Sequence, residues 1–275
     1  MFTDPAQISI QMLGPFSASL GTLQFAPRAA KQRQVLALLA LNTGRVVSVA
    51  TLTEELWDDR PPRSSAATVQ TYIFYLRRRL AAAMPRARVA NEYLQTMHSG
   101  YQLECRTDVQ EFHRLARIGR EAAEAGNPRA VSETLSRALA LWRGGAFSDV
   151  RQGRVLEGEA VSLEETRLGV QLRRIQADLA LDRHGDILGE LTLLAARHPM
   201  NENFAGLLMT ALYRSGHVAR ALEAFHRLRV TLNNELGVDP SARLRRLHQD
   251  ILSEHTSLDV DGFLAQEGLG AGLPR

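Results

Sequence analysis

Thr68-Val-Gln-Thr-Tyr-Ile-Phe-Tyr-Leu-Arg-Arg-Arg-Leu80 is the stretch whose spacing says most about the fold of this 275-residue chain. Its apolar residues recur at i, i+4, i+7 and i+11, the spacing of one buried helical face: Val69, Ile73, Leu76 and Leu80. We therefore predict a helix over about residues 64–80. At about 100° per residue, the outward side carries Thr71, Phe74, Tyr75 and Arg78, with Arg77 and Arg79 beside them and Gln70 on the shoulder.

This outward side has the residue types that recognise DNA. Arg and Gln side chains can make paired hydrogen bonds with base edges in the major groove, and Tyr or Thr can contact a phosphate or a thymine methyl group. A solvated arginine face fits the helix equally well, because Lys31 is the only lysine among 33 basic residues and arginine is abundant throughout. The segments on either side decide between these interpretations.

Those segments predict a winged helix-turn-helix domain. Short strands are expected at residues 8–13, 16–20, 23–25 and 45–47, and helices at residues 28–41 and from a cap at Ser48 to Trp57. After the arginine-rich helix, residues 93–97 and 101–103 predict two strands joined by the turn His98-Ser99-Gly100. In a domain with this order, the third helix enters the major groove and the hairpin wing touches the DNA backbone or the minor groove.

The charge distribution favours the same function. The net charge is +3, but residues 1–106 carry +5 and the remainder −2, and the stretch from Arg63 to Arg88 has six arginines and no acid. A basic module beside a near-neutral one is typical of nucleic-acid-binding proteins. As contacts to the DNA backbone or from the wing, we predict Arg28, Lys31, Arg63, Thr96, His98 and Ser99.

The rest of the chain predicts an all-α domain. Helices are expected at about residues 108–124, 130–142, 154–183, 187–197, 202–214, 218–234 and 240–254. His184-Gly-Asp186 and Ser215-Gly-His217 lie 31 residues apart, a degenerate repeat of tetratricopeptide type. Stacked helical pairs present surfaces to partners, which favours a binding or regulatory module. The predicted organisation is a DNA-binding domain at 1–106, a helical domain at 107–255 and a flexible tail at 256–275, mainly α with a small β component.

Residues 8–104 resemble the winged-helix effector domain of response regulators and, more narrowly, the Streptomyces antibiotic regulatory protein family. The matching stretches are Ile10-Gln-Met-Leu-Gly-Pro15, Lys31-Gln-Arg-Gln-Val-Leu-Ala-Leu-Leu39, Leu52-Thr-Glu-Glu-Leu-Trp57, Thr68-Val-Gln-Thr-Tyr-Ile73, Leu76-Arg-Arg78 and Gly100-Tyr-Gln-Leu103. Response regulators often carry basic or polar groups where this chain has Phe74 and Tyr75, and an arginine is common where the wing has His98.

The second half resembles the bacterial transcriptional activation domain of the same family, in its short two-domain form. The stretches that match are Ala138-Leu-Ala-Leu-Trp-Arg-Gly144, His198-Pro199, Leu207-Leu-Met-Thr-Ala-Leu-Tyr-Arg214 and Glu235-Leu-Gly-Val-Asp-Pro240. The resemblance implies a sequence-specific transcriptional activator of a secondary-metabolite gene cluster. It implies three partners: direct repeats of double-stranded promoter DNA, RNA polymerase holoenzyme, and a second protomer side by side on the DNA.

The sequence has few of the features that are typical of disulfide-rich proteins, metal-binding proteins or enzymes. One cysteine, Cys105, excludes a disulfide framework, and the histidines lack metal-ligand spacing, so we expect no metal site. The motifs of nucleotide-binding loops, zinc proteases and serine hydrolases are missing, and we expect neither an enzyme nor a cofactor. Without a signal peptide or membrane span, a cytoplasmic location is expected. The alternative function is a helical-repeat scaffold or adaptor that acts through protein contacts without specific DNA binding.

Overall fold

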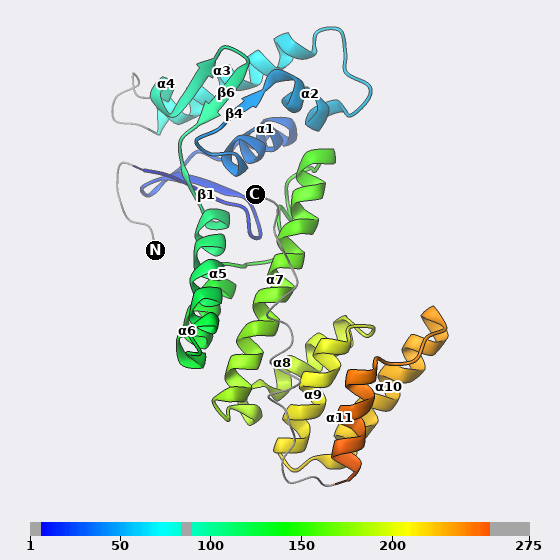
Figure 1. Ribbon diagram of the computed structural model, residues 1–275. Coiled ribbons are helices and arrows are strands. Elements are labelled where there is room, and N and C mark those ends of the chain that lie inside the picture. The colour runs from blue at the N-terminus through cyan, green and yellow to red at the C-terminus, as the bar shows by residue number, and fades with distance from the viewer. Residues whose placement is uncertain (1–6, 84–89, 254–275) are drawn as a thin grey trace. The chain divides into compact units, whose positions relative to one another are not determined.

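The computed structural model describes residues 7–83 and 90–253, which form mostly helices and two small sheets (Figure 1). Two compact units contain the described residues. The first comprises residues up to 118 together with 134–170, and the second comprises 119–133 together with the residues from 171 onward. The domain boundary expected from the sequence, between residues 106 and 107, therefore lies inside the first unit.

The first sheet belongs to the first unit and has the strand order β3-β2-β1-β7. Its first three strands were predicted from the alternating pattern, and β1 pairs antiparallel with β2, placing Ile8 opposite Leu20. The fourth strand, β7, has only two residues, pairs parallel with β1 and was not predicted. The bounds are β1 (Ile8–Gln11), β2 (Ser17–Leu20), β3 (Leu23–Gln24) and β7 (Arg106–Thr107).

Three helices and a second sheet complete the winged helix-turn-helix. The helices are α1 (Ala30–Leu41), α2 (Val49–Trp57) and α3 (Ser65–Ala82). As predicted, Ser48 caps α2, and its hydroxyl accepts a hydrogen bond from the Thr51 amide. The second sheet has the order β4-β6-β5, with β4 (Val46–Ser48), β5 (Leu94–Met97) and β6 (Gly100–Leu103). A one-turn helix, α4 (Ala90–Tyr93), precedes β5. The sequence predicted the strand to begin at Tyr93, but this residue ends α4 and the strand begins at Leu94.

The remaining elements are helices, as the sequence predicted. They are α5 (Asp108–Glu124), α6 (Pro128–Leu139), α7 (Arg154–Ala180), α8 (His184–Arg197), α9 (Glu202–Arg214), α10 (Val218–Leu236) and α11 (Ala242–Leu252). In the second unit α8 packs on α9, α9 on α10 and α10 on α11, so the chain forms successive helical pairs (Figure 1). Gly237 ends α10 in the left-handed conformation at φ 69°, which glycine adopts without strain.

Two features singled out in the sequence lie outside the described residues. They are the tail at 256–275 and the end of the acid-free stretch at Arg86 and Arg88. Within the described part of the chain, no helix is long and apolar enough to cross a membrane.

Candidate nucleic-acid interface

Helix α3 has the two faces that its sequence predicts. The four apolar residues at helical spacing are all buried: Val69, Ile73, Leu76 and Leu80. Five residues of the predicted recognition surface are exposed: Gln70, Thr71, Phe74, Tyr75 and Arg78. Phe74 is 61% and Tyr75 43% exposed, and their rings meet edge to face with centroids 5.7 Å apart. A large apolar surface therefore sits among polar groups on the outward side of this helix.

Arg77 connects α3 to the wing. Its guanidinium donates hydrogen bonds to the Leu94 carbonyl at 2.9 and 2.8 Å and to the Thr96 hydroxyl at 2.8 Å. Both acceptors belong to β5, so this side chain fixes the wing beside the helix. The structure thus gives Arg77 a positioning role, with its charge held between two elements of the predicted interface.

The Arg79 guanidinium is also hydrogen-bonded to other parts of the protein. Its guanidinium donates to the carbonyls of Phe25, at 3.0 Å, and of Ala26, at 2.8 Å, in the segment that precedes α1. Arg79 comes five positions after Phe74, which corresponds to about 140° around the helix axis. Its side chain therefore leaves the helix on a different side from that of Phe74. Among the three consecutive arginines, Arg78 is the one on the same exposed side as Phe74.

The wing is a hairpin with a two-residue turn at His98 and Ser99, one residue shorter than predicted, because Gly100 already pairs with Met97. His98, Ser99 and Thr96 are exposed. Gly100 allows the hairpin to lie against β4, since a Cβ there would come within 2.0 Å of the Val47 carbonyl oxygen. The three residues predicted to touch DNA from the wing are therefore presented on a closely packed support.

The other predicted backbone contacts differ in their surroundings. Arg28 and Arg63 are exposed, just before α1 and α3 respectively. The Lys31 ammonium instead lies 4.5 Å from the centre of the Trp57 ring, a cation–π contact. Burial, and then the positive charge of Arg151, lower the pKa of Lys31. The Lys31 ammonium therefore already interacts with a side chain of the protein.

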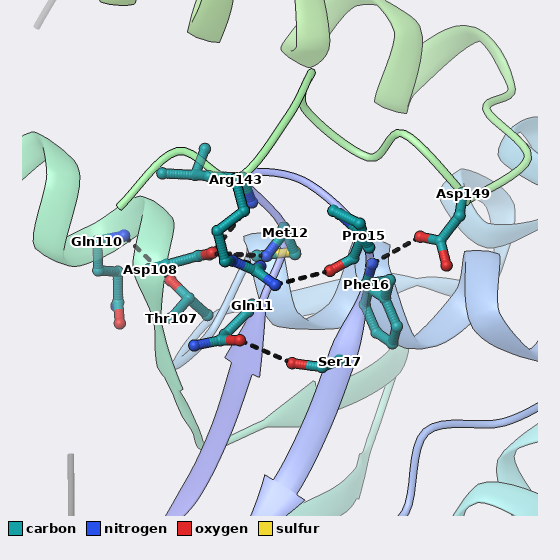
Figure 2. Close-up of polar contacts among 11 residues, drawn as sticks. Gln11, Met12, Pro15, Phe16, Ser17, Thr107, Asp108, Gln110, Arg143 and Asp149 are labelled. Carbon is teal, nitrogen blue, oxygen red and sulfur yellow. Dashed lines mark hydrogen bonds and ion pairs between the residues drawn. The ribbon is translucent and has the colours of Figure 1, made fainter. Parts of the chain in front are cut away.

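Three carboxylates that the sequence did not single out join the winged helix to residues 108–156 within the first unit. Asp108 is buried, and its carboxylate accepts from the amides of Met12, at 2.8 and 2.9 Å, and Leu13, at 3.0 Å (Figure 2). Burial raises the pKa of Asp108, and these amide bonds and the nearby Arg143 guanidinium oppose that rise. Asp149 accepts from the Phe16 amide at 2.6 Å.

Glu55 is the third of these carboxylates and is only 2% exposed. It accepts from the Gln34 side chain at 2.8 Å and from three amides at the start of α7: Gly153 at 2.7 Å, Val155 at 3.0 Å and Leu156 at 3.0 Å. A negative charge at a helix N-terminus satisfies otherwise unpaired amides and complements the helix dipole. Nothing in the local pattern singled out Glu55, because its partner Gln34 belongs to the polar start of α1, directly before the apolar run from Val35 to Leu41.

Two observations concern the metal-ligating and thiol side chains of the described residues. Among residues 7–83 and 90–253, no group of three or more His, Cys, Asp and Glu side chains is placed to hold a metal ion. Burial raises the pKa of the Cys105 thiol to about 12, while the Thr43 hydroxyl acts in the opposite direction and the Glu104 charge adds to the rise. A thiol with so high a pKa is a weak nucleophile at neutral pH.

Comparison with known proteins agrees with this architecture. The family described as "Transcriptional regulatory protein, C terminal" matches residues 26–103, and the "Bacterial transcriptional activator domain" matches residues 107–252. Regulatory protein DnrI of Streptomyces peucetius is 45% identical over 260 residues, covering 93% of this chain and 96% of its own. Transcriptional regulator RedD of Streptomyces coelicolor is 37% identical over 265 residues, covering 94% and 75%.

A solved structure of Mycobacterium tuberculosis EmbR, in complex with a low-affinity phosphopeptide, has the same fold. It superposes with a TM-score of 0.86 at 32% identity and covers 95% of this chain and 69% of the EmbR chain. The fold and the matches define a transcriptional regulator with a winged-helix domain followed by a helical activator domain. The chain belongs to the Streptomyces antibiotic regulatory protein family.

Proposed function

We propose that this protein activates transcription of a secondary-metabolite gene cluster by binding direct repeats near a promoter and recruiting RNA polymerase. The observation that carries the proposal is the outward side of α3, where five residues of the predicted recognition surface are exposed beside the wing. The hydrogen bonds from Arg77 to β5 support a preformed interface, because they fix the wing against the helix before DNA arrives.

In the proposed complex, α3 lies in the major groove. Gln70 and Tyr75 contact base edges, and Arg78 contributes phosphate affinity. The exposed residues Arg28 and Arg63, together with Thr96, His98 and Ser99 of the wing, contact the backbone. Base contacts would set the sequence read, and backbone contacts would fix the protein's register on the duplex.

Direct repeats require two protomers in the same orientation. Such an arrangement is head to tail, so different surfaces of the two copies meet on one side of the DNA. We assign the contacts with RNA polymerase holoenzyme to the helical pairs α8–α9 and α10–α11, since stacked pairs present extended binding surfaces. The protein would act by binding in the cytoplasm, where promoter DNA lies, and without a cofactor.

A footprint on the promoters flanking the protein's own gene tests the proposal. Full-length protein should protect two or more short direct repeats on one side of the helix, while a coding-region fragment of equal length should stay unprotected. Run-off transcription with RNA polymerase holoenzyme from the same promoter should then rise on adding the protein. Absence of protection on every flanking promoter would contradict the DNA-binding part, and an unchanged transcript beside an intact footprint would contradict activation.

A helical-repeat adaptor that works without specific DNA binding is the second candidate. The observation in its favour is that helices α8 to α11 of the second unit pack on one another in succession. Stacked helices of this kind often form surfaces that bind other proteins. The acid-free stretch of six arginines from Arg63 to Arg88 favours DNA instead. Retention on random DNA that is lost steeply with added salt distinguishes the two, because a protein that neutralises DNA phosphates releases their condensed counterions.

A further inference from the structure

The outward side of α3 carries an apolar stripe. Ala67, Thr71 and Phe74 follow the spacing i, i+4, i+7 of a single helical face, and all three are exposed. The Thr71 hydroxyl donates a hydrogen bond to the Ala67 carbonyl at 2.9 Å, so its polar atom is already engaged within the helix. We call these three residues the apolar stripe.

Phe74 is the dominant member of the stripe. Its side chain is 61% exposed, and its ring is supported at 5.7 Å by the edge-to-face ring of Tyr75. Aromatic pairs of this geometry are stabilised beyond simple burial, which keeps the exposed ring in place. Arg78 continues the same side of the helix, one turn further on.

The chemistry of the major groove determines what such a stripe can recognise. Base edges there present hydrogen-bond donors and acceptors, and the one apolar group among them is the 5-methyl of thymine. Alanine, the threonine methyl and phenylalanine are the side chains that make apolar contacts with that methyl group. The three residues of the stripe are of these three types.

We propose that the apolar stripe of Ala67, Thr71 and Phe74 reads thymine 5-methyl groups, so that each repeat of the operator contains thymine opposite Phe74. The inference rests on the proposed function, since it assumes that α3 enters the major groove. From residue 67 to residue 74 the helix rises about 10 Å, the length of roughly three base-pair steps. Phe74 contributes most of the discrimination because it offers the largest apolar surface.

Uracil substitution tests this directly, because uracil is thymine without the 5-methyl group. The promoter fragment that gives a footprint is amplified once with dTTP and once with dUTP, and the Kd of the full-length protein for each is measured by fluorescence anisotropy. Wild-type protein should bind the uracil DNA about 4-fold more weakly for each methyl group that the stripe buries. The ratio of the two Kd values is the quantity compared between variants.

Two variants make the ratio specific to Phe74. Phe74→Ala should lose most of the wild-type ratio, whereas Arg129→Ala, which removes an exposed side chain from α6, should keep it. Both residues are exposed, so circular dichroism should confirm that both variants fold. A wild-type ratio near one, or a full wild-type ratio retained by Phe74→Ala, would overturn the inference.

The test separates this inference from the proposed function. If the protein binds no promoter fragment specifically, both the proposed function and this inference are wrong. If it binds the fragment tightly but with equal Kd for thymine and uracil DNA, only the inference is wrong. If Phe74→Ala keeps both Kd values and loses only cooperative binding to repeated sites, Phe74 contacts the neighbouring protomer and the inference is likewise overturned.

Discussion

Replacing Glu55 with alanine should destabilise the first unit far more than its position on a short helix suggests. The substitution leaves three amides at the start of α7, and the buried side-chain amide of Gln34, without their carboxylate acceptor. A buried donor left unpaired costs about 1–3 kcal/mol, and a hydrogen bond to a charged group contributes about 1.5–3 kcal/mol. Because water can reach the partly buried amides, we expect a loss of about 3–5 kcal/mol in the free energy of unfolding.

The neighbouring glutamate provides a matched control. Glu54 has a side chain that is 47% exposed, with its carboxylate 3.7 Å from the Arg154 guanidinium. A surface pair of this kind contributes roughly 0–1 kcal/mol, so Glu54→Ala should change stability little. Urea unfolding followed by circular dichroism compares the two variants with the wild type. A difference below about 1 kcal/mol between Glu55→Ala and Glu54→Ala would refute the role given to Glu55.

Three further perturbations test other parts of the structure. Arg78→Ala should lower the slope of log Kd against log salt by about 0.9, while Arg129→Ala, which removes an exposed arginine from α6, should leave the slope unchanged. Cys105 should react with iodoacetamide at pH 8 at least about 100-fold more slowly in native than in urea-unfolded protein, because burial raises its pKa to about 12. The native state then holds this proton more tightly than the unfolded chain, so the stability linked to Cys105 is complete below about pH 9 and falls as the pH rises toward 12. Equal alkylation rates would contradict the burial of the thiol. Gly100→Ala should cost more than about 2 kcal/mol because its Cβ would meet the Val47 carbonyl oxygen at 2.0 Å, and Gly158→Ala, with nothing within 4 Å, should stabilise α7 by up to about 1 kcal/mol. If Gly100→Ala lowered the free energy of unfolding only slightly, the close contact between the wing and β4 would not be needed for stability.

Local periodicity predicted most of the fold. The spacing of Val69, Ile73, Leu76 and Leu80 identified the buried face of α3, and all four are buried. Ser48 was recognisable as a helix cap because capping depends on residues within one turn. The seven helices from α5 to α11 were also predicted, with ends that differ by a few residues, as expected where helix ends fray.

Contacts between distant segments were not predictable in the same way. Asp108 is bonded to amides 95 and 96 positions earlier in the chain, and nothing in the local pattern indicates which amides it meets. Strand β7 has two residues and exists because β1 lies beside it. Arg77 and Arg79 are the same residue type two positions apart, yet tertiary neighbours place one on the wing and the other on the segment before α1.

The central claim is that the outward side of α3 reads DNA sequence, and selection of binding sites from random DNA tests it most directly. Wild-type protein should enrich a short motif that recurs as a direct repeat. Gln70→Ala and Tyr75→Ala should each relax or change the preference at one or two positions of that motif, while the overall spacing of the repeats is kept. The same motif from wild type and both variants, or no enriched motif at all, would contradict the claim.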